Sequence, residues 1–383
     1  MRKAIRLIIG IAFLMYSTAF SQKIANFNNC AQLDAKNFNK IINGKQVGLY
    51  ILRNGNINAA ITNYGGRIVS LCAPDRKGNK EDIILGFKSI DDYLNATGVY
   101  HGAIIGRVAG RIANGKFDLD GYTYQLSLNG GINHQHGGPK GFHNQVWDVK
   151  SVSDTAIVLS YVSIDGEMGY PGNLIVEATY CLTNKDELTL KFTATTDNST
   201  PLNLTNHAFF NLAGEGDGDV LNHVLTIPSK YIVPVNSDKI PTGELLKVKG
   251  TPFDFRNGAT IGNGLVFEKD NDQLRFAGGY DQSYVLKKKK SDKLVLAATV
   301  IEPNSGRKLE VFTNELCVHF FSANFFKGID IGKMGKPFNY RSSFALETQN
   351  FPDGPNQKTF PSIILKPGEK YESQTIFHFT TTN

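Results

Sequence analysis

Alternation of apolar and polar residues runs through much of this 383-residue chain and constrains its fold more than any other feature. The segment DELTLKFTATT (186–196) places Leu188, Leu190, Phe192 and Ala194 on one face and mainly threonine and lysine on the other. A period of two residues is that of a β-strand with one buried face. Such segments are therefore predicted to be strands of an antiparallel sheet whose apolar face is covered.

Other segments extend this pattern over the rest of the chain. The dipeptide Asp120-Gly121 separates two short alternating runs and predicts a β-hairpin. SIDDYLNA (89–96) is expected to form one short helix, and no long apolar pattern has the helical period. Further alternating runs lie at 157–163, 173–183, 294–301, 308–313 and 316–326. We predict an all-β protein: one large antiparallel β-sandwich over residues 39–381, preceded by a polar lead at 22–38.

The first 21 residues have the layout of a secretory signal peptide. Three basic residues precede an apolar run from Leu7 to Tyr16, and small residues occupy the −3 and −1 positions before Gln22. The apolar run is short for a membrane span, which needs about 20 residues, so cleavage is favoured over a retained anchor. We expect an exported protein, periplasmic or secreted, with no membrane attachment after cleavage.

The net charge and the positions of the cysteines argue against nucleic-acid binding and against a disulfide-based fold. Removal of the predicted signal lowers the formal net charge from +6 to +3, which does not favour nucleic-acid binding. The run Lys287–Lys290 is interpreted as a solvated hairpin tip. Cys72, Cys181 and Cys317 each lie in an apolar strand-like run, where buried free thiols are as plausible as disulfides. We predict no disulfide framework.

Five stretches combine ionisable side chains with glycine and amide neighbours. Taken singly, each ionisable residue has an ordinary structural explanation, such as a turn cap, a surface ion pair or a histidine bonded within the core. The stretches are GRVAGRIANGKF (106–117), NGGINHQHGGPKGF (129–142), LNLTNHAFFNLAG (202–214), GGYDQSYVL (278–286) and FALETQNFPDGPN (344–356).

In combination, the phrases NHQHGG, NLTNHAFFNLAG and LETQNFPDGPN resemble the galactose mutarotase (aldose 1-epimerase) family. MGYPGNL (168–174) and FPSIILKPGEKY (360–371) add to the resemblance, which covers residues 48–379. The resemblance implies a large β-sandwich, the supersandwich of that family, with a sugar groove on a concave sheet face. It also implies an isomerase that interconverts the α and β anomers of free aldohexoses such as galactose and glucose.

Residue by residue, the resemblance implies a set of roles. The glutamate of LETQ is the general base, which is Glu347, and the histidine of NLTNH is the general acid, which is His207. The histidine of the HGG motif, His136, supports the substrate near the ring oxygen. The arginine of GRI and the aspartate of GYDQ, Arg111 and Asp281, bind sugar hydroxyls.

Aromatic residues and two departures from the family pattern concern sugar binding. Tyr170 is expected to contact the sugar, and candidates for stacking on its apolar face also include Phe209, Phe210 and Trp147. Where the family often has asparagine before the arginine, this chain has Gly110. Where the family commonly has glutamine, it has His319, which we treat as a candidate substrate contact. Both departures concern sugar preference rather than reaction type.

The implied chemistry requires one acid and one base, because a proton leaves the anomeric hydroxyl while another reaches the ring oxygen. No metal, nucleotide or other cofactor is needed, the expected partner is a monosaccharide, and we expect a monomer or a weak dimer. Three alternatives remain open. A glycoside hydrolase would need two carboxylates about the scissile bond. A metal site could combine His134 and His136 with His207 and Glu347. A non-catalytic carbohydrate-binding protein, or an epimerase of another sugar, would keep the groove.

Overall fold

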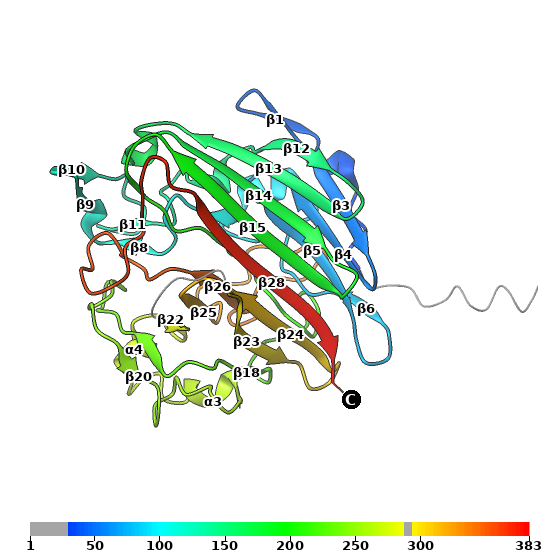
Figure 1. Ribbon diagram of the computed structural model, residues 1–383. Coiled ribbons are helices and arrows are strands. Elements are labelled where there is room, and N and C mark those ends of the chain that lie inside the picture. The colour runs from blue at the N-terminus through cyan, green and yellow to red at the C-terminus, as the bar shows by residue number, and fades with distance from the viewer. Residues whose placement is uncertain (1–29, 287–292, 383) are drawn as a thin grey trace, which may run out of the picture.

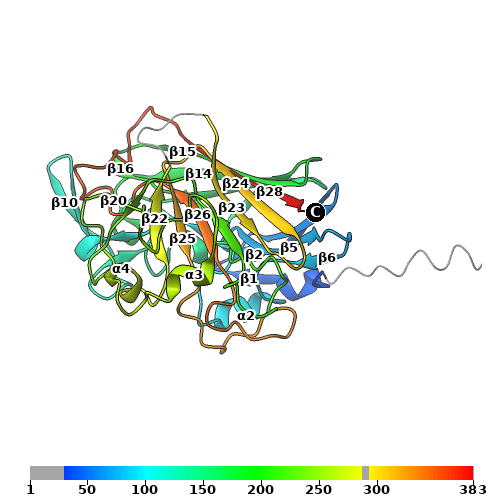
Figure 2. The ribbon, with the colours of Figure 1, turned by 90° about the horizontal axis from the view of Figure 1, so that it is seen from below.

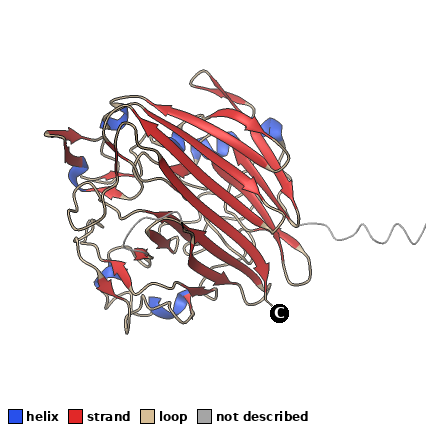
Figure 3. Cartoon of the chain, viewed as in Figure 1, coloured by secondary structure: helices blue, strands red, loops and turns tan. Residues whose placement is uncertain are grey.

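The computed structural model describes residues 30–286 and 293–382, and strands make up nearly all of its regular structure (Figure 3). The all-β prediction is confirmed. The predicted signal segment (1–21) and the predicted hairpin tip at Lys287–Lys290 lie outside the described residues. Within the described ranges, no helix is long and apolar enough to cross a membrane.

One layer of the fold is a nine-stranded antiparallel sheet in the order β12-β13-β14-β15-β28-β24-β23-β18-β21 (Figure 1). The last strand, β28, lies at the centre of this sheet between β15 and β24, so the end of the chain joins its two halves. The strands are β12 Asp148–Val152, β13 Ala156–Ser163, β14 Leu174–Leu182, β15 Glu187–Thr196, β18 Val224–Thr226, β21 Ala259–Thr260, β23 Val295–Ile301, β24 Arg307–Thr313 and β28 Tyr371–Thr381.

Two smaller antiparallel sheets form the second layer. Leu190 in the large sheet, Ile57 in the four-stranded sheet and Phe320 in the five-stranded sheet belong to one buried apolar cluster, which defines the core. The four-stranded sheet contains β3 Leu49–Asn54, β4 Ile57–Thr62, β5 Arg67–Pro74 and β6 Lys80–Asp82. The five-stranded sheet contains β19 Tyr231–Val233, β20 Leu246–Lys247, β22 Asp281–Val285, β25 Cys317–Phe321 and β26 Ala345–Gln349.

Short strand pairs and helices complete the fold and carry several segments of the motifs found in the sequence. Figure 2 shows α2 on the opposite side of the molecule from β14 and β15. The pairs are β1 Lys40–Ile42 with β2 Lys45–Val47, β7 Ile104–Ile105 with β17 Thr205–Asn206, β8 Arg111–Ile112 with β11 His134–Gln135, β9 Lys116–Leu119 with β10 Tyr122–Gln125, and β16 Thr200–Pro201 with β27 Ile364–Leu365. The helices are α2 Ile90–Asn95, α3 Ile261–Leu265 and α4 Asp272–Arg275, with 3₁₀ turns η1 Ala35–Phe38, η2 Ala113–Gly115, η3 Phe142–Asn144 and η4 Glu167–Gly169.

The alternation in the sequence corresponds to burial in the structure. In β15, Leu188, Leu190, Phe192 and Ala194 face the core and are at most 3% exposed, while Lys191 on the other face is exposed. The predicted hairpin is also present, because Asp120 and Gly121 both adopt positive φ between β9 and β10. Two consecutive residues with positive φ match the twist of the flanking strands.

The predicted short helix is confirmed as α2. The side chain of Ser89 accepts a hydrogen bond from the backbone amide of Asp92 and satisfies one of the free donors at the helix start. Tyr93 and Ile90 bury the inner face of the helix.

The cysteine prediction is wrong at one position. Cys30 in the predicted polar lead forms a disulfide with Cys72 in β5, whereas Cys181 and Cys317 are free. Phe38, also in that lead, is fully buried. Sequence alternation placed Cys72 in a strand correctly, but it carried no information on which distant segment lies across from that strand. The folded unit therefore begins within the predicted lead.

Replacing Leu190 by alanine tests the core assignment. Because the side chain is 1% exposed in the central cluster, we expect a loss of about 2–5 kcal/mol in the free energy of unfolding. Denaturant unfolding would measure it, with Lys191→Ala on the outer face of the same strand as the matched control. That variant should stay within about 0.5 kcal/mol of wild type. Equal losses in both variants would contradict the assignment of the buried face.

Candidate active site

A cavity of about 730 Å³ brings together six of the seven predicted site residues. These six come from segments far apart in the chain, namely β8, the turn after β11, the turn after β17, β22, β25 and β26. They are Arg111, His136, His207, Asp281, His319 and Glu347. The remaining wall combines apolar side chains, such as Phe209 and Phe325, with polar ones, such as Asn324 and Asp330.

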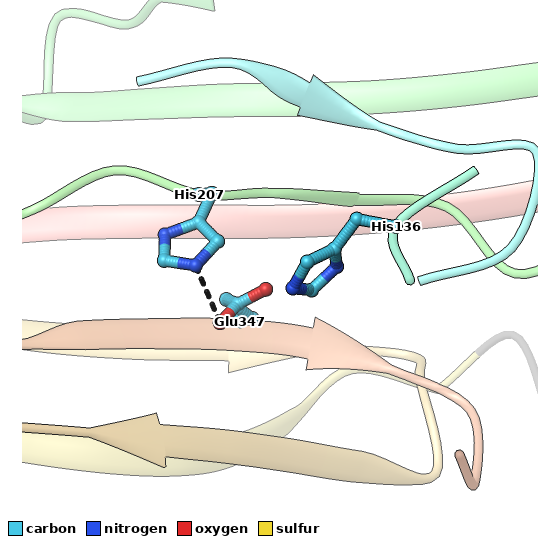
Figure 4. Close-up of side chains that lie close together, drawn as sticks. All are labelled: His136, His207 and Glu347. Atoms are coloured by element: carbon cyan, nitrogen blue, oxygen red, sulfur yellow. Dashed lines mark ion pairs between the residues drawn. The ribbon is translucent and has the colours of Figure 1, made fainter. Parts of the chain in front are cut away.

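Glu347 lies at the centre of this group, on the fully buried strand β26 (Figure 4). Its side chain is 2% exposed, and its Oε1 lies 3.4 Å from Nε2 of His207. The other oxygen, Oε2, has no hydrogen-bond partner in the part of the chain that the structure describes. A buried carboxylate oxygen without a protein partner is costly to desolvate. It is therefore available to accept a hydrogen bond from a bound molecule.

His207 is held by its backbone and by aromatic neighbours. It follows β17, and its amide donates to the carbonyl of Ala103. The ring packs against Phe209 at 4.6 Å between ring centroids and lies nearly parallel to Tyr100 at 5.9 Å. Burial lowers the pKa of His207, and the adjacent charge of Glu347 opposes that shift. The imidazole and the carboxylate thus share a short path for a proton.

His136 completes the group from the opposite side of the carboxylate, as Figure 4 shows. Its Nδ1 accepts a hydrogen bond of 3.3 Å from the amide of Gly110. Burial, followed by the nearby His207 and Arg111, lowers the pKa of His136 well below its ordinary value. A neutral ring that accepts at Nδ1 carries its proton on Nε2. His136 is therefore a hydrogen-bond donor toward the cavity.

This arrangement does not favour the metal alternative. Ligand atoms of His136, His207 and Glu347 all lie within 4.8 Å of one another. A histidine that ligates a metal through Nε2, however, normally donates its other ring N–H to an acceptor. His136 instead faces an amide donor at Nδ1, which stabilises the wrong tautomer for that role.

His134 lies outside the cavity, so it does not join the predicted metal set. Its Nδ1 lies 2.6 Å from the carbonyl oxygen of Ser127, and its Nε2 lies 2.7 Å from the hydroxyl of Tyr170. His134 and His136, which the metal alternative combined in one ligand set, do not line the same cavity. The reason is that His136 adopts φ 51° and the chain turns there.

Tyr170 is the one predicted site residue that the fold does not bring to the cavity. It is 1% exposed, packs on Phe117, and lies under the guanidinium of Arg107. A buried phenol needs a hydrogen-bond partner, and His134 supplies it. The expected contact with the sugar is therefore corrected to a structural role. Of the other stacking candidates, Phe209 lines the cavity, whereas Phe210 and Trp147 belong to the core.

Asp281 and His319 form a second acid–imidazole pair in the same cavity. The register of β25 places His319 opposite Ser283 on β22 and opposite Glu347 on β26. Nε2 of His319 lies 2.8 Å from Oδ1 of Asp281, and Nδ1 lies 2.9 Å from Oγ of Ser283. Since both ring nitrogens have protein partners, His319 orients Asp281 rather than offering a free donor to a sugar.

The charges of this pair shift both pKa values. Burial acts to raise the pKa of Asp281, but the hydrogen bond and charge of His319 outweigh it and lower the value. Burial acts to lower the pKa of His319, but the hydrogen bond and charge of Asp281 raise it. Between these two pKa values, the pair is ionised.

Sequence reasoning missed two rings beside the acid–base group. Tyr100 lines the cavity and contacts the rings of His136 and His143, each at 4.8 Å between centroids. His101 is fully buried among aromatic rings, and neither of its nitrogens has a partner among the described residues. The segment TGVYHG shows neither alternation nor a motif of known chemistry, so no signal in it pointed to the cavity.

The fold and the site together define a class: a β-sandwich protein whose cavity brings a buried carboxylate and several imidazoles together. The family model described as aldose 1-epimerase matches residues 48–378. The galactose mutarotase of Rattus norvegicus is 41% identical over 88% of this chain and 95% of its own length. The aldose 1-epimerase of Escherichia coli is 36% identical over 88% of this chain and 96% of its own length.

Solved structures agree with this result. A crystal structure of an aldose epimerase homologue from C. elegans has a TM-score of 0.78 at 28% identity, covering 88% of this chain and all of that one. Galactose 1-epimerase from Lactobacillus acidophilus has a TM-score of 0.77, also at 28% identity, covering 90% of this chain and 97% of that one. The chain belongs to the aldose 1-epimerase family and is an isomerase.

Buried neutral histidines make the fold sensitive to acid. Burial lowers the pKa to about 3 for His101 and His143, and to about 4 for His134 and His223. In the unfolded chain, histidines bind protons below about pH 6.5, whereas these four remain neutral in the folded state. The free energy of unfolding therefore falls as pH drops from that value toward 4. Each contributes a slope of about 1.4 kcal/mol per pH unit within that window.

His101→Phe tests this dependence, because phenylalanine suits the aromatic surroundings of that ring. We expect the slope of unfolding free energy against pH to decrease by about 1.4 kcal/mol per pH unit between pH 6 and 4. Denaturant unfolding at a series of pH values would measure it. An unchanged slope would show that this ring does not remain neutral in the folded state.

His319→Gln tests the ion pair with Asp281. The lowered pKa of Asp281 stabilises the fold above about pH 4, and this stabilisation is lost as pH falls through the pKa of Asp281 in the folded state. The raised pKa of His319 stabilises the fold fully below about pH 6.5, and this stabilisation is lost as pH rises through the pKa of His319 in the folded state. The stability difference between wild type and variant should therefore be largest between about pH 4 and 6.5. A difference that does not vary with pH would contradict an ionised pair.

Proposed function

We propose that this protein is a mutarotase that interconverts the α and β anomers of free aldohexoses such as galactose and glucose. The observation that carries the proposal is the approach of Glu347 and His207 to 3.4 Å within a cavity lined by polar groups. The galactose mutarotases among its relatives support galactose as a substrate.

The reaction follows from the positions of these groups. Glu347 removes the proton of the anomeric hydroxyl, and His207 delivers a proton to the ring oxygen, so that the bond between the anomeric carbon and the ring oxygen breaks. The exposed carbonyl turns about the adjacent carbon–carbon bond. The same two groups then reverse their roles and close the ring on the other face of the carbonyl. His136, with its proton on Nε2, donates a hydrogen bond at the ring oxygen and stabilises charge that develops there.

The remaining polar groups bind and orient the sugar. Arg111 and Asp281 contact its hydroxyls, and His319 fixes the orientation of Asp281. Apolar walls, including Phe209, exclude water and face the apolar side of the sugar ring. The whole acid–base group lies within one chain, so the site needs no residue of a second subunit, and we propose a monomer or a weak dimer.

We also propose that the protein is exported, to the periplasm or beyond the cell. The signal-like layout of residues 1–21 is one support. The disulfide between Cys30 and Cys72 is a second, independent support, since disulfides persist mainly in oxidising compartments. Fractionation of the native host, with detection of the cleaved chain, would test the location.

Polarimetry on freshly dissolved α-glucose and α-galactose tests the activity. We expect wild type to speed the decay of optical rotation, and Glu347→Gln and His207→Asn each to lower kcat by about 10²–10⁴-fold, because each removes one proton transfer. Thermal unfolding would check that both variants fold.

Matched controls are Glu177→Gln on the outer face of β14 and His378→Asn on β28, which make the same substitutions away from the cavity. Both should keep the wild-type rate. Sugar binding without any acceleration by wild type would instead favour a non-catalytic carbohydrate-binding protein. Undiminished turnover by Glu347→Gln would remove that residue from the base role.

A further inference from the structure

Tyr100 lies in the middle of the imidazole group, yet the proposed mechanism gives it no role. Its ring is nearly parallel to His207, with an interplanar angle of 14°, and meets His136 and His143 edge to face. Three imidazoles from three different segments thus pack around one phenol ring. The ring of Tyr100 limits where the general acid can move.

The main chain on both sides of Tyr100 is held by a buried arginine. The guanidinium of Arg67, which is 1% exposed, donates hydrogen bonds of 2.9 Å to the carbonyls of Val99 and His101 and one of 2.8 Å to that of His143. The carbonyl of Tyr100 itself accepts from the amide of Ala103. The residue is therefore held rigidly in a segment that has no regular secondary structure.

The tyrosine hydroxyls of this protein differ in whether they are paired, and that of the buried Tyr284 has no partner in the described chain. Tyr180 and Tyr280 donate to the carbonyls of Gly66 and Pro252. The hydroxyl of Tyr100 has no hydrogen-bond partner among residues 30–286 and 293–382, and this half-buried residue lines the cavity. An unpaired phenol hydroxyl at a cavity wall is available to donate a hydrogen bond to a bound molecule.

Two functional groups of the same cavity affect the protonation of this hydroxyl. Burial raises the pKa of Tyr100 to about 12, with Arg111 lowering it and Glu347 raising it. The hydroxyl is consequently neutral at physiological pH and keeps its proton to donate. Arg111 and Glu347, the proposed sugar-binding cation and the proposed base, line the same cavity as this donor.

We propose that Tyr100 is a substrate-binding residue whose hydroxyl donates a hydrogen bond to a sugar hydroxyl held between Arg111 and Glu347, while its ring positions His207. The inference rests on the proposed mutarotase function. It divides the side chain into two separable parts. The hydroxyl contributes to binding, and the ring contributes to the geometry of proton transfer.

Tyr100→Phe removes the hydroxyl alone and keeps the ring. We expect KM for galactose and glucose to rise about tenfold with kcat within about twofold of wild type, because a hydrogen bond made equally to substrate and transition state affects KM. The melting temperature should not fall. A purely structural tyrosine would give no change in KM, so an unchanged KM would overturn the inference.

Tyr340→Phe is the matched control. Tyr340 also lines the cavity, but it is 46% exposed and its hydroxyl already donates to the carbonyl of Gly278 at 2.8 Å. This variant should keep the wild-type KM. If it raised KM as much as Tyr100→Phe does, the effect would not be specific to Tyr100.

Tyr100→Leu tests the ring. Loss of the surface that packs on His207 should lower kcat at least tenfold below that of Tyr100→Phe, with the folded state confirmed by circular dichroism. Equal kcat values for the two variants would overturn the positioning role.

Deoxy sugars identify the partner of the hydroxyl. Wild type and Tyr100→Phe would be compared on glucose analogues lacking the hydroxyl at C2, C3, C4 or C6. One analogue should be turned over equally well by both proteins, because the bond that the substitution removes is already absent. If every analogue kept the full tenfold difference, the partner would be none of the four non-reacting hydroxyls and the inferred binding role would fail. Absence of mutarotation by wild type would instead reject the proposed function itself.

Discussion

A carboxylate buried to 2% exposure dominates the organisation of this protein. Glu347 cannot lie in an apolar interior without nearby groups that compensate for the loss of water. His207 faces one of its oxygens, and His136 lies across from it as a neutral donor. The other oxygen has no protein partner in the described chain. Because this oxygen receives no hydrogen bond from the described protein, it is available to a bound molecule that can donate one.

The scaffold holds this group rigid by placing it where sheets and short strand pairs meet. The antiparallel register of β25 and β26 sets His319 beside Glu347, and the pair of β7 with β17 sets the backbone of His207. In segments near the cavity that have no regular secondary structure, buried side chains rather than neighbouring strands form hydrogen bonds with the backbone. Arg67 binds three carbonyls of such chain, and the packing of the large core holds these elements in register.

The electrostatics of the site separate two kinds of imidazole. Burial dominates for His207 and His136, whose pKa values are lowered, while a direct hydrogen bond to a carboxylate dominates for His319, whose pKa is raised. One cavity therefore contains neutral imidazoles that can exchange or donate protons and an imidazole paired with Asp281. This difference supports the acid–base roles proposed for the first kind and the orienting role proposed for the second.

Local patterns in the sequence determined a large part of this protein. The alternation around Leu190, the hairpin at Asp120-Gly121 and the helix after Ser89 depend on neighbouring residues, so each could be predicted and each is present. The motifs also named six residues that share the cavity. Only the tertiary structure decided that Cys30 meets Cys72, that Tyr170 bonds to His134 and that Tyr100 packs among imidazoles. Those contacts join segments far apart in the chain, and alternation reports which face of a strand is buried but not which distant side chain lies against it.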